Sequence, residues 1–120
     1  MTTFTYDHQR LAEVLYEQFI EDGYRGIECE RGAVYIDCNQ HPILGLIHFD
    51  QTHATDYAVD VQRGLQKQIQ ERSYISPITN TVMSHLDVTA DTAVPATSPY
   101  LDGWTGHAYH VWEKEYAEAL

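Results

Sequence analysis

The sequence predicts an α+β domain in the order N-terminal helix, three-stranded antiparallel meander, helix, further strand or hairpin, and C-terminal helix. Three observations predict this order: apolar residues first recur at helical spacing, then alternate as they do in strands, and later return to helical spacing. A chain of 120 residues has the usual size of one domain. We therefore expect residues 1–120 to form a single acidic α+β domain.

The first helix is expected between Asp7 and Asp22. Asp7 is a suitable N-cap, and Gly23 follows the last periodic residue as a helix stop. The buried stripe of this helix would consist of Leu11, Val14, Leu15 and Phe19.

Residues 26–38 are expected to form a β-hairpin, because apolar and polar residues alternate in both of its arms. In the register that fits both arms, Glu30 pairs with Ala33. The nearly continuous apolar run from Ile43 to Phe49 then suits a third strand that is covered on both faces. The hairpin face directed at the core would carry Ile27, Cys29, Val34, Ile36 and Cys38, and the exposed face would carry Glu28, Glu30, Tyr35 and Asp37.

Cys29 and Cys38 are expected to be free, buried thiols. In this register they lie on opposite arms and are offset by about four residues. At about 3.4 Å per residue, this offset separates the two cysteines by roughly 13 Å. A disulfide needs Cα atoms within about 7 Å of each other. Free thiols agree with a reducing compartment.

The second half of the chain is expected to begin with a helix that Thr55 caps and that runs to about Arg72. Weak alternation over residues 82–88 suits a fourth strand, and the turn-forming residues of 89–106 suit a long loop or short hairpin. A last helix is expected over residues 107–120. The buried side chains would be Ala58, Val61, Leu65 and Ile69 in the second helix, and Tyr109, Trp112 and Tyr116 in the last.

The chain is strongly acidic, with 18 Asp and Glu against 7 Lys and Arg and a formal net charge of −11. A protein that binds nucleic acid directly normally carries a basic patch, so we expect no nucleic-acid partner. The same charge disfavours anionic membranes, and the longest apolar run is too short to cross a bilayer. Because no secretory signal opens the chain, a cytoplasmic location is expected. The glycines form no phosphate-binding loop, so no cofactor is expected.

An acidic ridge on the first helix is the main candidate for a partner-binding surface. Glu13, Glu17 and Glu21 recur at intervals of four residues, and like charges at this spacing cost helix stability. A local cost without a local gain can point to function. The predicted partner-binding surface consists of Glu13, Tyr16, Glu17, Ile20 and Glu21 on the helix and Glu28, Glu30 and Asp37 on the hairpin.

An alternative site lies where the third strand would end. His48, Asp50 and His53 could hold a divalent metal and leave positions open for water, as a small metal-dependent hydrolase requires. A further alternative is an oligomeric small-molecule binder, or a homodimer, that uses the aromatic side chains near the C-terminus. Partner binding without a metal is the preferred interpretation.

In size, acidity and element order the chain resembles two families, the class I type III secretion chaperones and the phage-encoded anti-CRISPR proteins that mimic DNA. No residue is carried over from either family. The second resemblance implies a non-enzymatic inhibitor from a phage or mobile element that engages a basic protein partner, such as a nucleic-acid-binding protein. The chain is therefore expected to be a binding protein rather than an enzyme.

Overall fold

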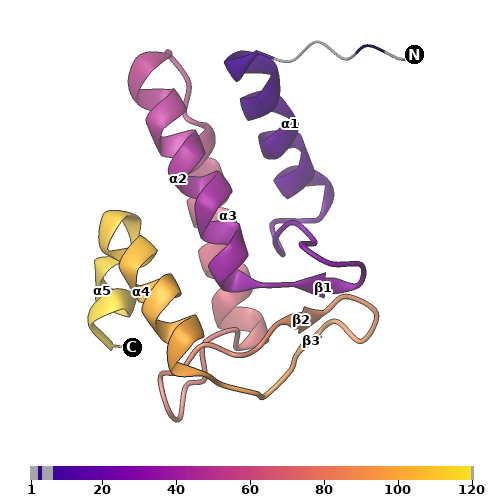
Figure 1. Cartoon of the computed structure of the whole chain (residues 1–120), viewed down its shortest axis with the longest axis vertical. Helices are drawn as coiled ribbons and strands as arrows, with labels where there is room; N and C mark the ends of the chain where they lie inside the picture. Colours follow the sequence, from indigo (N-terminus) through magenta and orange to yellow (C-terminus); the bar gives the residue numbers. More distant parts are fainter. Residues whose placement is uncertain (1–2, 4–6, 120) are drawn as a thin grey trace.

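The structure is a computed structural model that describes residue 3 and residues 7–119, without the side chains of Tyr116 and Ala119 (Figure 1). In this part of the chain the elements are α1 (His8–Glu21), β1 (Ala33–Val34), α2 (Ile36–Thr52), α3 (Tyr57–Arg72), β2 (Leu86–Asp87), β3 (Thr92–Ala93), α4 (Pro99–Trp112) and α5 (Lys114–Ala119). The strands form one antiparallel sheet in the order β1-β2-β3. The predicted α+β class, with helices and one three-stranded antiparallel sheet, is therefore confirmed.

The molecule is elongated, with principal extents of 46 × 31 × 23 Å. Figure 1 shows α2 and α3 packed together along the long axis, with α1 on one flank, α4 and α5 on the other, and the small sheet at one end. Among the residues described, no helix is both long and apolar enough to cross a membrane.

Helix α1 begins and ends where its sequence predicts. The Asp7 carboxylate accepts a hydrogen bond from the Arg10 amide at 2.7 Å, and Gly23 follows the helix with φ of +62°. The predicted buried stripe is only partly right, because Phe19 is fully buried whereas Leu11 remains 50% exposed. The exposed Leu11 lines a cavity between α1 and α2, which is described below.

The predicted hairpin over residues 26–38 forms only near its tip. Glu30 and Ala33 make the expected antiparallel bridge, but the second arm ends at Val34. Strand β1 then pairs with β2 instead of with a strand from residues 43–49. The β2–β3 hairpin lies in the two segments expected to hold a fourth strand and a loop or short hairpin.

The predicted strand from Ile43 to Phe49 is wrong, because this segment is the middle of helix α2. Ile43 and Leu46 are both fully buried, since α2 packs against α1, α3 and α4. A short run of mainly apolar residues does not by itself distinguish a strand from a helix. In the structure its burial follows helical spacing, with Ile43, Leu46 and Phe49 buried and Gly45 and His48 exposed. The residues that were expected in a strand therefore form part of a central helix.

The later helices follow the prediction with two corrections. All four residues predicted on the buried side of α3 are buried, but Thr55 is not its N-cap, because Asp56 holds that position. Helix α4 begins at Pro99 rather than near residue 107, since the Ser98 hydroxyl accepts a hydrogen bond from the Tyr100 amide at 3.3 Å and starts the helix. Tyr109 is buried as expected, whereas the predicted burial of Tyr116 falls on a side chain outside the described ones.

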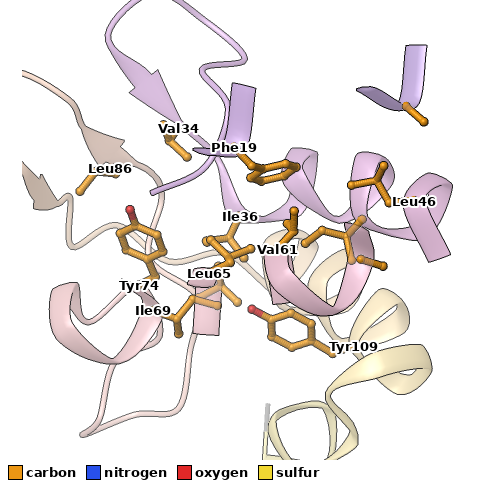
Figure 2. Packing of buried hydrophobic residues seen from close by; sticks show 14 of the residues in the cluster. Phe19, Val34, Ile36, Leu46, Val61, Leu65, Ile69, Tyr74, Leu86 and Tyr109 are labelled. Carbon is orange, nitrogen blue, oxygen red and sulfur yellow. The ribbon is translucent and has the colours of Figure 1, made fainter. Parts of the chain in front are cut away.

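The core joins all three layers of helices. Figure 2 shows Phe19 from α1, Leu46 from α2 and Val61 from α3 in one cluster, with Tyr109 of α4 beside it. Each fully buried side chain of this size contributes roughly 1.5–3 kcal/mol relative to an exposed one. This packing fixes α2 in the centre of the molecule, with its N-terminal end close to the 26–32 loop.

Candidate functional site

A cavity of about 430 Å³ lies between α1, the 26–32 loop and the N-terminal half of α2. We call it the thiol pocket, because both cysteines of the chain line it. Its lining includes Leu15, Ile27, Cys29, Cys38, Asn39 and His41.

The two thiols are free, as predicted, but their predicted separation and burial are wrong. Cys29 and Cys38 line the same cavity, and Cys29 is close enough to raise the pKa of the Cys38 thiol. Cys29 is exposed and Cys38 is partly buried, so neither is a core residue. The reason is the helix: because the chain turns into α2 after Tyr35, Cys38 is carried back towards Cys29 instead of further along a strand.

Asn39 holds the loop and the helix in this arrangement. Its side chain is 1% exposed, and its Oδ1 accepts a hydrogen bond from the Ile27 amide at 2.7 Å. Its Nδ2 donates to the carbonyl oxygens of Ile27 at 3.0 Å and Tyr35 at 2.8 Å, and lies 3.9 Å from Cys29 Sγ. Asn39 is therefore a positioning residue for the exposed thiol.

Gly26 permits the close approach of the loop to α2. Its φ is +112°, a conformation that residues with a Cβ rarely adopt. A Cβ at this position would lie 2.5 Å from Val34 Cγ1 and 3.2 Å from Asn39 Oδ1. Any side chain here would push the loop away from Asn39 and separate the two cysteines.

The Cys38 thiol stays protonated at neutral pH. Burial is the main cause that raises its pKa to about 12, followed by the hydrogen bond with Cys29 and the negative charges of Asp37 and Glu30. A thiol in this state donates a hydrogen bond and is a poor nucleophile. Burial and Glu30 also raise the pKa of Tyr35 beside it.

Pro42 leaves a backbone carbonyl that the neighbouring imidazole can satisfy. A proline in the interior of α2 has no N–H, so the Cys38 carbonyl loses its helical donor. His41 Nδ1 lies 3.3 Å from that carbonyl oxygen and can replace the donor when it carries the proton. This tautomer leaves His41 Nε2 free to accept a proton.

Three carboxylates from the predicted partner-binding surface lie around the thiols. Glu28 lines the thiol pocket, and its Oε2 accepts a hydrogen bond from the Gly32 amide at 2.8 Å. Glu30 is exposed and close enough to Cys38 and Tyr35 to affect both. Asp37 lines a smaller adjoining cavity of about 100 Å³, and its buried Oδ1 has no hydrogen-bond partner among the described residues.

The helical part of the predicted surface lies elsewhere and is partly neutralised. Arg10 Nη1 lies 3.5 Å from Glu13 and 3.7 Å from Glu17, so the ridge carries its own cation. Tyr16 turns towards α3, where its hydroxyl donates to Asp60 at 2.8 Å and its ring stacks on Tyr57. Ile20 and Glu21 remain exposed, and a partner role for them stays a prediction.

The structure does not bring His48, Asp50 and His53 together. Asp50 faces α3 and accepts hydrogen bonds from the Tyr57 and Ala58 amides and the Thr55 hydroxyl. The two histidines instead line a cavity on the α1 side of α2. Within the described ranges, no three His, Cys, Asp or Glu side chains form a group that could hold a metal ion.

Sequence reasoning missed the site at the start of α2. It placed the two cysteines in the core, and it assigned no role to Asn39 or His41. The usable signal was Pro42. A proline inside a helix leaves the carbonyl four residues earlier, that of Cys38, without its backbone donor, and His41 lies close enough to supply one. That signal requires the helix to be recognised first.

The family model described as "Linalool dehydratase/isomerase" matches residues 1–120. A match of this extent to an enzyme family overturns the expectation of a non-enzymatic inhibitor and of a phage DNA mimic, and the hydrolase, chaperone and oligomeric-binder alternatives fit no better. Acidity and element order, on which those expectations rested, are properties that unrelated families share. Over its whole length, this chain belongs to the linalool dehydratase/isomerase family.

Proposed function

We propose that the thiol pocket takes part in the dehydration or isomerisation of a small unsaturated alcohol of the linalool type. The observation that carries this proposal is the meeting of the two thiols and the His41 imidazole in one cavity. The family match supplies the class of reaction and substrate.

Dehydration of an alcohol needs a proton donor and a proton acceptor, and one group can serve as both in turn. The hydroxyl oxygen gains a proton, the C–O bond breaks with its electron pair going to the leaving water, and a neighbouring carbon then loses a proton. The electron pair of that C–H bond becomes the new double bond. In an isomerisation, water returns to the other end of the allylic cation and gives up the proton it carried.

His41 is the residue we assign to proton transfer, at its Nε2 atom. The ring enters the reaction as the imidazolium, with Nδ1–H directed at the Cys38 carbonyl: Nε2–H gives its proton to the hydroxyl, and the same atom then takes one back from carbon. The Cys38 thiol holds the hydroxyl oxygen by donating a hydrogen bond to it. The Glu28 carboxylate favours the cation electrostatically, because the surrounding pocket is mainly apolar.

The test compares purified variants in conversion of linalool, measured by gas chromatography. His41→Gln and the double variant Cys29→Ala with Cys38→Ala should each lose about a hundredfold in rate, the usual contribution of proton transfer or of a preorganised donor. His110→Gln, an exposed histidine of α4, is the matched control and should keep the parent rate. Parent-like rates in both site variants would show that the chemistry lies elsewhere.

The cytoplasmic location expected from the sequence remains part of this proposal. Two free thiols that line one cavity are typical of a protein in a reducing compartment, which supports it.

A further inference from the structure

A second cavity of about 320 Å³ lies beside the thiol pocket along the α1–α2 interface. We call it the tail groove. The two cavities share two lining residues, Leu15 of α1 and Gly45 of α2, so they meet at that point. The walls of the tail groove beyond this junction include Leu11, Leu46, Phe49, His48 and His53.

The lining of the tail groove suits a hydrocarbon. Leu46 and Phe49 are buried along one wall, whereas Leu11 on the opposite helix stays half-exposed towards the cavity. His53 stacks on Phe49 with ring centroids 3.9 Å apart, which adds another flat face at that end. An apolar groove beside a pocket that holds a few polar groups is the form expected for an amphipathic alcohol.

Gly45 at the junction is not explained by backbone geometry or packing. Gly23, Gly26 and Gly32 are the described glycines with positive φ, so Gly45 has an ordinary helical conformation. A Cβ at Gly45 would meet nothing within 4 Å, whereas one at Gly64 would lie 2.2 Å from the Tyr24 ring. Glycine inside a helix is destabilising relative to alanine, so its presence at residue 45 has a cost without a local structural gain.

We infer that Gly45 is a specificity-determining residue that keeps the thiol pocket and the tail groove joined. The hydroxyl end of the substrate lies at the thiols, and its hydrocarbon tail passes Gly45 into the tail groove. Linalool has this form, with its hydroxyl near one end and a branched unsaturated tail at the other. The inference rests on the proposed function and adds the residue that controls whether an extended apolar tail is accepted.

The test uses two alcohols with the same reacting end. Dimethylvinylcarbinol carries the tertiary allylic hydroxyl of linalool without the tail. Gly45→Leu should lower kcat/KM for linalool about tenfold more than for dimethylvinylcarbinol, because the new side chain fills the path of the tail alone. Gly45→Ala should shift the same ratio in the same direction, but less.

Gly103→Leu is the matched control for adding a leucine to an open helical glycine. Gly103 lies inside α4, outside both cavities, and a Cβ there would also meet nothing within 4 Å. This variant should leave the ratio between the two alcohols unchanged. An equal loss on both alcohols in Gly45→Leu would overturn the inference while the proposed function stands.

A separate measurement covers the case in which the parent protein converts neither alcohol, which would refute the proposed function. Nuclear magnetic resonance of the His48 and His53 rings should then still respond to linalool in the parent and not in Gly45→Leu. If the ring signals of the parent did not change when linalool was added, the inference would be overturned as well.

Discussion

The two ends of helix α2 carry the same kinds of side chain and use them differently. At the C-terminal end, Asp50 accepts two amide hydrogen bonds and one hydroxyl hydrogen bond at the start of α3. The His53 ring is stacked on Phe49, and its Nδ1 lies 3.0 Å from the Phe49 carbonyl oxygen. At the N-terminal end, Cys38 and His41 face a cavity.

This difference shows that residue type alone does not identify a site. An acid and two histidines near a predicted strand end suggested a metal centre, yet Asp50 and His53 make hydrogen bonds within the fold and His48 lines the cavity on the other side of α2. The thiols and the imidazole at the other end of α2 line a cavity, where they can form hydrogen bonds with a bound molecule. Polar side chains that line an apolar cavity and have hydrogen-bonding groups left unpaired are the better indicator of function.

The largest expected effect at the N-terminal end is that of Asn39→Ala. The substitution leaves the Ile27 amide and two carbonyl oxygens without their buried partner, so the free energy of unfolding should fall by about 3 kcal/mol. Urea denaturation measures this. Asn39→Asp keeps an acceptor for the Ile27 amide and should lose less, so equal losses in the two variants would contradict the assigned role.

At the C-terminal end, Asp50→Ala should lower the free energy of unfolding by about 2 kcal/mol, because α3 loses the carboxylate that accepts its first amides. The rate of linalool conversion per folded molecule should stay at the parent level. Asp37→Ala should show no comparable loss of stability, since its buried oxygen has no partner in the described part of the chain. A lost rate in Asp50→Ala would mean that both ends of α2 serve the reaction.

The sequence supported good predictions wherever the determining interactions are local. Helix α1 has its cap at Asp7 and its stop at Gly23, and the stripe of α3 repeats at helical spacing. The contact that shapes the site is not local, because Asn39 reaches across to Ile27. Once residues 43–49 were assigned to a strand, Cys38 could not be placed next to Cys29.

The function could be predicted even less, for a different physical reason. Net charge reports solubility and the general class of partner, and it carries no information about a reaction. The groups assigned to the reaction are a histidine, two thiols and a carboxylate that only the fold of α2 gathers. Their spacing in the chain matches no motif that the chemistry requires.

The thiols themselves should differ in reactivity. Cys29 is exposed, whereas the raised pKa of Cys38 leaves little thiolate at about pH 8. Iodoacetamide should therefore alkylate Cys29 at least about tenfold faster than Cys38, since only the thiolate reacts. Peptide mass spectrometry over time measures both rates, with the unfolded protein as the control in which they converge. Faster alkylation of Cys38 would refute its role as a protonated donor.

The smallest effect, and the one that compares the two ends directly, is the fall of stability in alkaline solution. Burial raises the pKa of Cys38 from 9.0 to about 12 at one end of α2. Near the other end, the hydrogen bond to Asp60 is the main cause that raises the pKa of Tyr16 from 10.0 to about 12. In both groups the folded protein holds a proton that the unfolded chain has released, so the free energy of unfolding falls as pH rises through this range.

The onset of that fall should separate the two groups. Cys38→Ala should flatten the curve from about pH 9 and Tyr16→Phe from about pH 10, each by less than about 1 kcal/mol, because solvent screens partly exposed groups. A fall should remain in both variants, since burial also raises the pKa of Tyr74. Urea denaturation at stepped pH, with each variant referred to its own value at neutral pH, gives the differences.

If Cys38→Ala followed the parent curve from pH 9 upward, the thiol would ionise equally in the folded and unfolded chain. Cys38 would then be available as a thiolate nucleophile near that pH, and the hydrogen-bond donor that the proposed reaction needs would have to come from another residue of the pocket.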